Sequence, residues 1–150
     1  MLGFVGQEER ALDAQCRVAI PKEWRVMIKD SPLYLLPVDG IIQVATNAGF
    51  ASFLEKARQV SLTDPQGAKA LAMFGARAQQ CRCDSQGRIQ INQKLADYAG
   101  LKDTVMLVGA IATMQIWNKD KWTSQQSQLP EEFIYDVVNK IQSKPGDLEN

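Results

Sequence analysis

The sequence predicts an α+β fold built from two copies of one strand-rich unit, with helices between and after the copies. The first observation is a pair of matched blocks: LDAQCRVAIP from Leu12 matches CDSQGRIQIN from Cys83 at an offset of 71 residues. The second is another pair, IIQVATNAGF from Ile41 and TMQIWNKDKW from Thr113, at an offset of 72 residues. The third is that apolar residues alternate along the short strand in each of the first two blocks, at Val18 and Ile20 and at Ile89 and Ile91. One inserted residue across half the chain is what a duplication produces.

Each half is expected to contain the same strands in the same order. A leading strand comes first, and an Asp-x-x-x-Arg turn follows it. A short strand with alternating apolar residues then leads to a short helical segment, and two further strands complete the half. The turns between these last strands fall at Asp39-Gly40 and at Gly109-Ala110. In chain order, the expected strands are 4–12, 18–20, 33–38 and 41–46 in the first half, and 79–83, 89–91, 105–110 and 113–117 in the second.

Capping residues place the helices. Asn92 can cap a short helix that Gly100 ends. A longer helix is expected from Asn47, and Asp64 followed by proline marks the start of the next one. A last helix begins near Pro130 and ends at Pro145-Gly146, and the final residues are expected to fray.

These elements divide the chain into four segments. Residues 1–56 form a first module, and residues 57–78 form a connecting helical segment. Residues 79–125 form a second module, and residues 126–150 form a C-terminal helix and tail.

Composition excludes several classes of function. The chain has no histidine, which removes the commonest general base and metal ligand. Its three cysteines, at 16, 81 and 83, lack the paired spacing of a zinc site, and no phosphate-binding glycine loop is present. Carboxylate pairs such as Asp97 with Asp103, or Glu131 with Glu132, are better explained as exposed helix charges. We therefore expect no enzyme activity, no metal, no cofactor and no small-molecule substrate.

The chain carries no membrane-spanning stretch and no secretory signal, so a cytoplasmic location is expected. Its 17 basic and 17 acidic residues cancel, but they are segregated along the sequence. Residues 17–29 hold four basic residues and one acid, and residues 77–88 hold three arginines and one acid. Residues 130–150 hold five acids and two lysines. Both copies of the Asp-x-x-x-Arg turn therefore lie within basic stretches.

The repeated turn has a clear physical interpretation. An Asp side chain can accept hydrogen bonds from backbone N–H groups two or more residues later, which holds a turn in place. Glycine before the arginine allows a positive φ. The arginine then offers a planar fork of donors that suits a phosphate or the O6/N7 edge of guanine. A single such turn is more simply a structural Asp–Arg pair, but two copies in basic stretches favour nucleic-acid binding.

The residues from Phe4 to Trp122 resemble the MraZ family, which fuses two SpoVT/AbrB-type modules. The family opens with Phe-x-Gly and continues with Leu-Asp-x-Lys-Gly-Arg, an apolar strand and Ile-Pro. The resemblance implies a duplicated swapped-hairpin, AbrB-like double-split β-barrel with flanking helices. The matching positions are Phe4, Gly6, Leu12-Asp13, Arg17 and Ile20-Pro21, and the second copy is similar over FGARAQQCRCDSQGRIQI and YAGLKDTVMLVGAIATMQIWNKDKW.

The resemblance also implies a function. The family is a sequence-specific regulator of transcription, associated with the bacterial division and cell-wall gene cluster, and it binds promoter repeats as a closed ring. The partners would be double-stranded promoter DNA and further copies of the chain, with no membrane, at the nucleoid. By position, Arg17 and Arg88 would contact DNA. Asp13, Asp84 and Gly87 would order the loops, and Lys22 and Arg25 are candidate phosphate contacts.

The sequence departs from the family pattern inside both loops. Position 16 is Cys where glycine is usual, and a left-handed backbone there costs on the order of 1–2 kcal/mol, so a distorted first loop is expected. Gln15 and Gln86 replace lysines that could contact phosphates, which lowers the expected affinity for DNA. Cys16 could instead act as a redox-sensitive switch. The alternative function is therefore an AbrB-like protein-interaction module or ring scaffold with little affinity for DNA.

Overall fold

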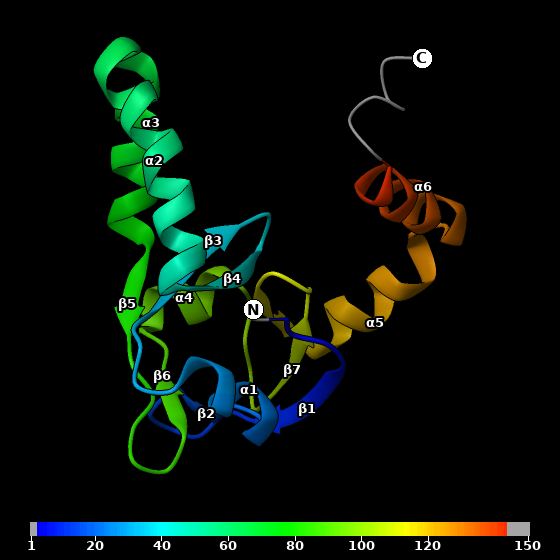
Figure 1. Ribbon diagram of the computed structural model, residues 1–150. Coiled ribbons are helices and arrows are strands. Elements are labelled where there is room, and N and C mark those ends of the chain that lie inside the picture. Colours follow the sequence, from blue (N-terminus) through cyan, green and yellow to red (C-terminus); the bar gives the residue numbers. More distant parts are fainter. Residues whose placement is uncertain (1–2, 144–150) are drawn as a thin grey trace. The chain divides into compact units, whose positions relative to one another are not determined.

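The structure is a computed structural model that describes residues 3–143 (Figure 1). The chain divides into two compact units, Met1–Lys119 and Asp120–Asn150. The first unit combines helices with antiparallel sheet, so the α+β class is confirmed. In chain order its elements are β1 (Gln7–Ala11), β2 (Arg17–Ala19), α1 (Lys22–Ile28), β3 (Leu33–Val38), β4 (Ile41–Thr46), α2 (Asn47–Thr63), α3 (Pro65–Arg77), β5 (Gln79–Cys81), β6 (Arg88–Gln90), α4 (Gln93–Tyr98), β7 (Thr104–Gly109) and β8 (Met114–Asn118).

The strands form two sheets whose order mirrors the sequence repeat. The larger sheet has the order β1-β7-β8-β4-β3-β5, and β2 pairs with β6 in a separate two-stranded ribbon. In the centre of the larger sheet Gln43 lies opposite Gln115, the residue that it matches at the offset of 72. At one edge Arg10 lies opposite Val105, and at the other edge Cys81 lies opposite Leu33. These two pairs are equivalent, because Arg10 matches Cys81 and Leu33 matches Val105 in the sequence repeat. The first strand of each half therefore pairs with the third strand of the other half.

The hydrophobic core lies between the ribbon, the larger sheet and two short helices. Val18 and Ile89, which face each other in the ribbon, are both buried. Trp24 and Ile28 anchor α1 in this core, and Leu95 and Ala96 anchor α4. The core contains residues from both halves, so each half contributes to a single hydrophobic cluster.

Local sequence signals account for the boundaries of these elements. The two-residue turn Asp39-Gly40 has φ values of 54° and 77°, as a tight hairpin between β3 and β4 requires. Asn92 accepts a hydrogen bond from the Leu95 N–H at the start of α4, and Gly100 follows the helix with a φ of 63°. Asp64 accepts one from the Gly67 N–H, and Pro65 occupies the first position of α3, as predicted.

Helices α2 and α3 form a hairpin that projects from the sheet (Figure 1). Neither helix contains a fully buried residue. The hairpin begins at Asn47, where the sequence predicts it, and α2 runs without a break through residues 56 and 57. The hairpin is therefore one structural element, which spans the end of the predicted first module and the connecting segment.

The second unit contains two further helices, α5 (Lys119–Gln128), which begins at the end of the first unit, and α6 (Glu131–Gln142). Helix α6 begins next to Pro130, as predicted, whereas its predicted end at Pro145-Gly146 and the frayed tail lie outside the described residues. Helix α5 was not predicted, because its sequence KDKWTSQQSQ is polar on all sides and has no apolar period. Within residues 3–143, no helix is long and apolar enough to cross a membrane.

Candidate nucleic-acid interface

The β2–β6 ribbon brings both predicted arginines to one surface. Its register places Val18 opposite Ile89, and these two side chains face the core. Because side chains alternate along a strand, Arg17 and Arg88 lie on the opposite face of the ribbon. Side-chain exposure agrees with this, at 32% for Arg17 and 27% for Arg88. The two arginines therefore share one accessible face of a two-stranded antiparallel ribbon.

In the first loop, Asp13 holds the turn and orients the arginine. Its Oδ1 accepts hydrogen bonds from the backbone N–H groups of Gln15, at 2.9 Å, and Arg17, at 2.8 Å. Its Oδ2 accepts one from Nε of Arg17 at 2.7 Å. Because only Nε contacts this carboxylate, the terminal Nη1 and Nη2 groups can still form the two-pronged donor.

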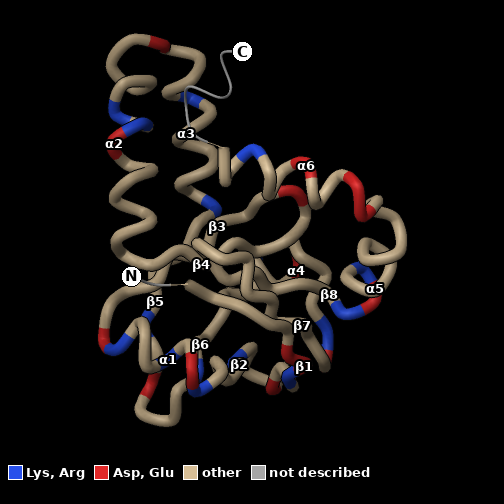
Figure 2. Tube along the Cα trace, turned by 45° about the vertical axis from the view of Figure 1, so that its right-hand side comes forward, with Lys and Arg blue, Asp and Glu red and all other residues tan. Residues whose placement is uncertain are grey.

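The second loop repeats this arrangement bond for bond. Asp84 Oδ1 accepts from the backbone N–H groups of Gln86, at 2.8 Å, and Arg88, at 3.0 Å, while Oδ2 accepts from Nε of Arg88 at 3.0 Å. Nη1 of Arg88 also lies 4.0 Å from Oδ2 of Asp13, so the carboxylate of the first loop lies near both arginines. Figure 2 shows basic and acidic positions side by side around β2 and β6.

The predicted distortion of the first loop is wrong. Cys16 has a φ of 59° and Gly87 has a φ of 76°, so both turn residues are left-handed. The two turns are also closed by equivalent backbone hydrogen bonds. Cys16 N–H donates to Asp13 O at 2.9 Å, and Gly87 N–H donates to Asp84 O at 3.0 Å. The cysteine therefore adopts the glycine conformation, at the cost that a Cβ atom brings to that region.

Replacing Cys16 with glycine is expected to stabilise the protein by about 1 kcal/mol, because glycine occupies a left-handed turn without the Cβ penalty. Thermal or urea unfolding of the variant measures this gain. The matched control is Gly87→Cys, which places the same residue in the second loop and is expected to destabilise. A Cys16→Gly variant less stable than the parent would contradict the expectation.

The two loops differ in what packs beneath them. A Cβ atom on Gly87 would clash with the guanidinium of Arg25, so the α1 arginine occupies the space that the missing side chain leaves. Beneath the first loop, Cys16 Sγ instead lies 3.7 Å from Oε1 of Gln93 at the start of α4. The second loop therefore has the Arg25 guanidinium packed against its turn residue, whereas the turn residue of the first loop contacts the amide side chain of Gln93.

Of the two candidate phosphate contacts, only Arg25 is brought to a loop. It is half-buried against Gly87, and its Nε atom is buried with no hydrogen-bond partner among the described residues. Lys22 is exposed at the start of α1. The sequence did not predict that Arg25, in the first half, packs against Gly87 in the loop of the second half. The signal that could have revealed it is the alignment itself, which matches Arg25 with the small residue Ala96 and Gly87 with the larger Cys16.

The pKa values of Asp13 and Asp84 lie below the ordinary value, mainly because the backbone N–H groups of Arg17 and Arg88 donate to the charged carboxylates. A lowered pKa means that the loop bonds stabilise the fold at neutral pH and are lost only as the pH falls through that lowered value. The chain contains no histidine that would titrate at higher pH.

We therefore expect the loop amides of Gln15, Arg17, Gln86 and Arg88 to keep constant NMR shifts from about pH 8 to about pH 5, and to change only below about pH 4. A midpoint near pH 6 would contradict this expectation.

Cys81 and Cys83, two of the three cysteines, are half-buried. Burial raises the pKa of Cys81 to about 12, with a further contribution from Cys83, and burial also raises the pKa of Cys83. Both remain thiols at neutral pH, which makes them poor metal ligands. Among the residues that the structure describes, no group of three or more potential ligands is placed to hold a metal ion.

Comparison with known proteins places these features in a family. The sequence model described as "MraZ protein, putative antitoxin-like" matches residues 73–142. A protein named transcriptional regulator MraZ from Natranaerobius thermophilus is 31% identical over 130 residues, which is 87% of this chain and 91% of that protein. A protein of the same name from Acetivibrio thermocellus is 30% identical over 81% of this chain and 85% of the relative's length. One from Caldicellulosiruptor saccharolyticus is 28% identical over 97% of this chain and 98% of its own.

Proposed function

Because this chain belongs to the MraZ family, we propose that it is a DNA-binding regulator of transcription, as the names of its relatives state. The observation that carries the proposal is the pair of aspartate-anchored arginines on one face of the β2–β6 ribbon. The major groove of B-DNA admits a two-stranded ribbon, and an arginine fork fits the O6/N7 edge of guanine. Arg17 and Arg88 would contact the DNA, and the two aspartates would hold both forks ready before binding. No catalytic role is needed for this function.

Ordered loops favour specific binding for a thermodynamic reason. An arginine on a mobile loop loses rotamer freedom when it binds, whereas an arginine already tied through Nε loses less. Arg25 beside Gly87 would add a phosphate contact to the second loop, and the exposed Lys22 would add one at the start of α1. We propose that the second loop contributes more to affinity than the first.

We further propose that each half is a SpoVT/AbrB-type module, with boundaries at residues 1–56 and 79–125, and that the two modules form a swapped-hairpin double-split barrel. Supporting this proposal, each sheet pairs equivalent residues of the two halves, as Gln43 with Gln115 and Val18 with Ile89 do.

Self-association would compensate for the modest charge of one chain. Two arginine loops supply limited affinity, but several copies in a closed ring would engage promoter repeats together and gain avidity. We propose such a ring, acting in the cytoplasm at the nucleoid on the division and cell-wall gene cluster.

The test is a fluorescence titration of the purified protein with the DNA upstream of its own gene, against a shuffled fragment of the same length and composition. Specific binding predicts tighter binding to the upstream fragment at every salt concentration. Equal affinity for both fragments would overturn sequence-specific regulation. Because phosphate contacts release counterions, the slope of log affinity against log salt also reports how many are made.

The competing function is a protein-interaction module or ring scaffold with little affinity for DNA. It is favoured by Gln15 and Gln86, which are exposed and uncharged in both loops, and by the net charge of zero. Absence of DNA binding at low salt, together with a stable protein complex, would select this alternative.

A further inference from the structure

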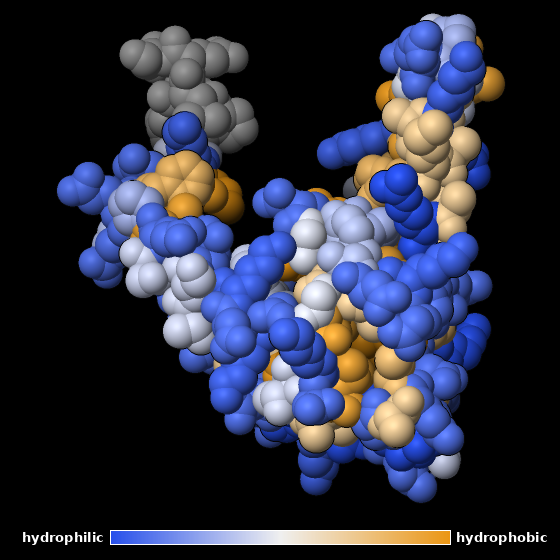
Figure 3. All heavy atoms as spheres, turned by 180° about the vertical axis from the view of Figure 1, so that it is seen from behind, coloured by the Kyte–Doolittle hydropathy of each residue, from blue (hydrophilic) through white to orange (hydrophobic). Residues whose placement is uncertain are grey.

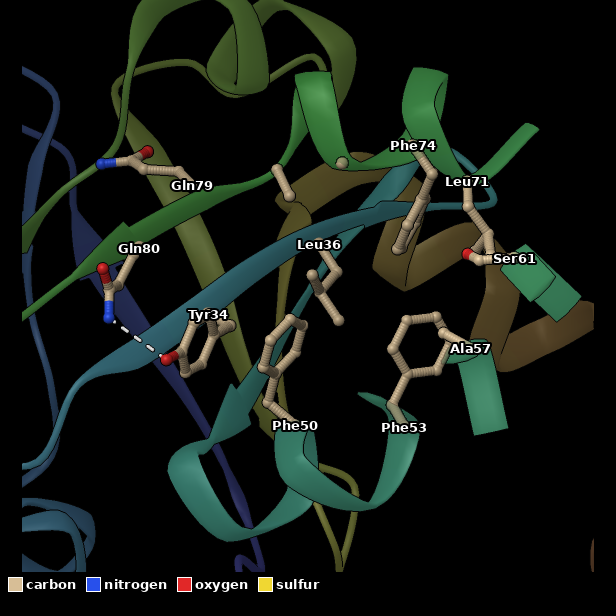
Figure 4. A pocket seen from close by; sticks show the side chains of 12 residues that line it. Tyr34, Leu36, Phe50, Phe53, Ala57, Ser61, Leu71, Phe74, Gln79 and Gln80 are labelled. Carbon is tan, nitrogen blue, oxygen red and sulfur yellow. Dashed lines mark hydrogen bonds between the residues drawn. The ribbon is translucent and has the colours of Figure 1, made fainter. Parts of the chain in front are cut away.

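An apolar groove lies between the helical hairpin and the larger sheet. It has a volume of about 330 Å³ and is lined by α2, α3 and β3. Tyr34 and Phe50 stack with their ring centroids 4.0 Å apart, and Phe53 lies 5.9 Å from Phe74. Figure 4 shows these rings around the groove, with Gln80 donating to the Tyr34 hydroxyl at its rim. We call this site the hairpin groove.

The second unit carries an apolar surface without a partner among its described residues. On α6, five side chains fall at helical spacing along one side and are between 41% and 77% exposed. We call this surface the apolar face of α6; its members are Phe133, Ile134, Val137, Val138 and Ile141. Within α5, Trp122 is the only large apolar residue. Figure 3 shows apolar side chains on α6 and along the hairpin.

We propose that the apolar face of α6 from one copy of the chain docks into the hairpin groove of a second copy. An amphipathic helix binds a groove through residues spaced by about one turn, as Phe133, Val137 and Ile141 are. This inference rests on the self-association in the proposed function, and it assigns the surfaces that join the copies.

Charge complementarity favours this pairing. The hairpin, residues 47–77, carries four basic and two acidic residues, an excess of two positive charges. Helix α6 carries three acids and one lysine, an excess of two negative charges. Figure 2 shows the basic positions on α2 and α3 and the acidic ones on α6. Opposite charge steers the two surfaces together and disfavours pairing of a hairpin with another hairpin.

Topology within the first unit separates the hairpin from the point where this unit ends. Strands β4 and β8 are antiparallel neighbours, with Ile42 opposite Ile116. Strand β4 continues into α2 at Asn47, whereas β8 continues into α5 at Lys119. Within the first unit, the start of the hairpin and Lys119 therefore lie at opposite ends of this strand pair. A contact between two different surfaces of identical chains propagates head to tail, and it closes into a ring when the rotation allows.

Matched substitutions in the full-length protein test the two surfaces. Val137→Asp, within the apolar face, is compared with Asn139→Asp, which adds the same charge to the polar side of α6. Phe53→Glu, in the hairpin groove, is compared with Gln59→Glu elsewhere on α2. Native mass spectrometry is expected to show single chains for Val137→Asp and Phe53→Glu and the parent assembly for both controls. Assemblies that survive both disruptive substitutions would overturn the proposal.

A photocrosslinking residue at position 134, in isotopically heavy protein mixed and reassembled with light protein, identifies the occupant. Heavy–light crosslinks from α6 to residues 47–77 support docking on a second copy. Crosslinks confined to heavy chains, or crosslinks to other segments, overturn it. DNA titrations of the same samples separate the two proposals. Heavy–light crosslinks in a protein that does not bind DNA would refute the proposed function alone, whereas DNA binding without these crosslinks would refute the docking alone.

Discussion

Replacing Arg88 with alanine is expected to weaken binding to promoter DNA by roughly tenfold to a hundredfold, about 1–3 kcal/mol per chain. The variant loses the guanidinium that Asp84 holds through Nε at 3.0 Å. Arg17→Ala is expected to weaken binding less, because Arg25 adds no charge beside the first loop. A fluorescence titration at fixed salt measures both effects.

The control for this prediction is Lys69→Ala, which removes one positive charge from an exposed position on α3. It is expected to bind DNA like the parent, because Lys69 lies outside the ribbon and its loops. Native mass spectrometry should show the parent assembly for Arg17→Ala and Arg88→Ala. If the double variant Arg17→Ala/Arg88→Ala bound DNA like the parent, neither arginine would be part of the interface.

The variant Asp84→Asn tests separately whether the aspartate anchor of Arg88 matters for DNA binding. Its amide can accept from the backbone but cannot also accept at Nε of Arg88, so a smaller loss of affinity is expected.

Replacing Gly109 with alanine is expected to destabilise the fold by roughly 2–3 kcal/mol, because the added methyl group has no space. A Cβ atom at this position would lie 2.6 Å from the carbonyl carbon of Phe4 and from the backbone nitrogen of Val5. Phe4 is fully buried and exchanges two backbone hydrogen bonds with Ile111, so the N-terminal segment cannot move aside without losing core contacts.

Gly3→Ala is the matched control, since among the described residues its Cβ would meet only the carbonyl oxygen of Ile111, at 4.0 Å. Urea unfolding is expected to show a stability close to that of the parent for Gly3→Ala and a large loss for Gly109→Ala. Equal stability of the two variants would contradict the close approach at Gly109.

The sequence predicted most strands, because alternating apolar residues and short turns are local signals. The segments LYLLPV and IIQVAT coincide with β3 and β4, and Asp39-Gly40 forms the predicted turn. The leading strand was placed at residues 4–12 but forms regular pairing only from Gln7 to Ala11. Gly6, with a φ of 94°, separates this strand from the isolated bridge at Phe4.

The site was only partly predictable. Local spacing predicted that each aspartate would cap its own turn, and the hydrogen bonds of Asp13 and Asp84 have this geometry. The packing of Arg25 against Gly87 joins residues 62 positions apart and depends on the pairing of β2 with β6. Helix α5 was missed for a different reason, since a polar helix leaves no apolar period in the sequence.

The exchange of strands between the halves has a consequence for synthesis on the ribosome. Within residues 3–143, β1 pairs only with β7 and β2 pairs only with β6, so neither has its partner until the second half has been translated. Among the strands within the first 46 residues, only β3 and β4 can pair with each other. Strands β1 and β2 cannot pair until residues 88–109 have been synthesised. Such long-range pairing slows folding and leaves strand edges open in the nascent chain. A chain truncated before β6 would therefore be a substrate for chaperones or proteases rather than a working half.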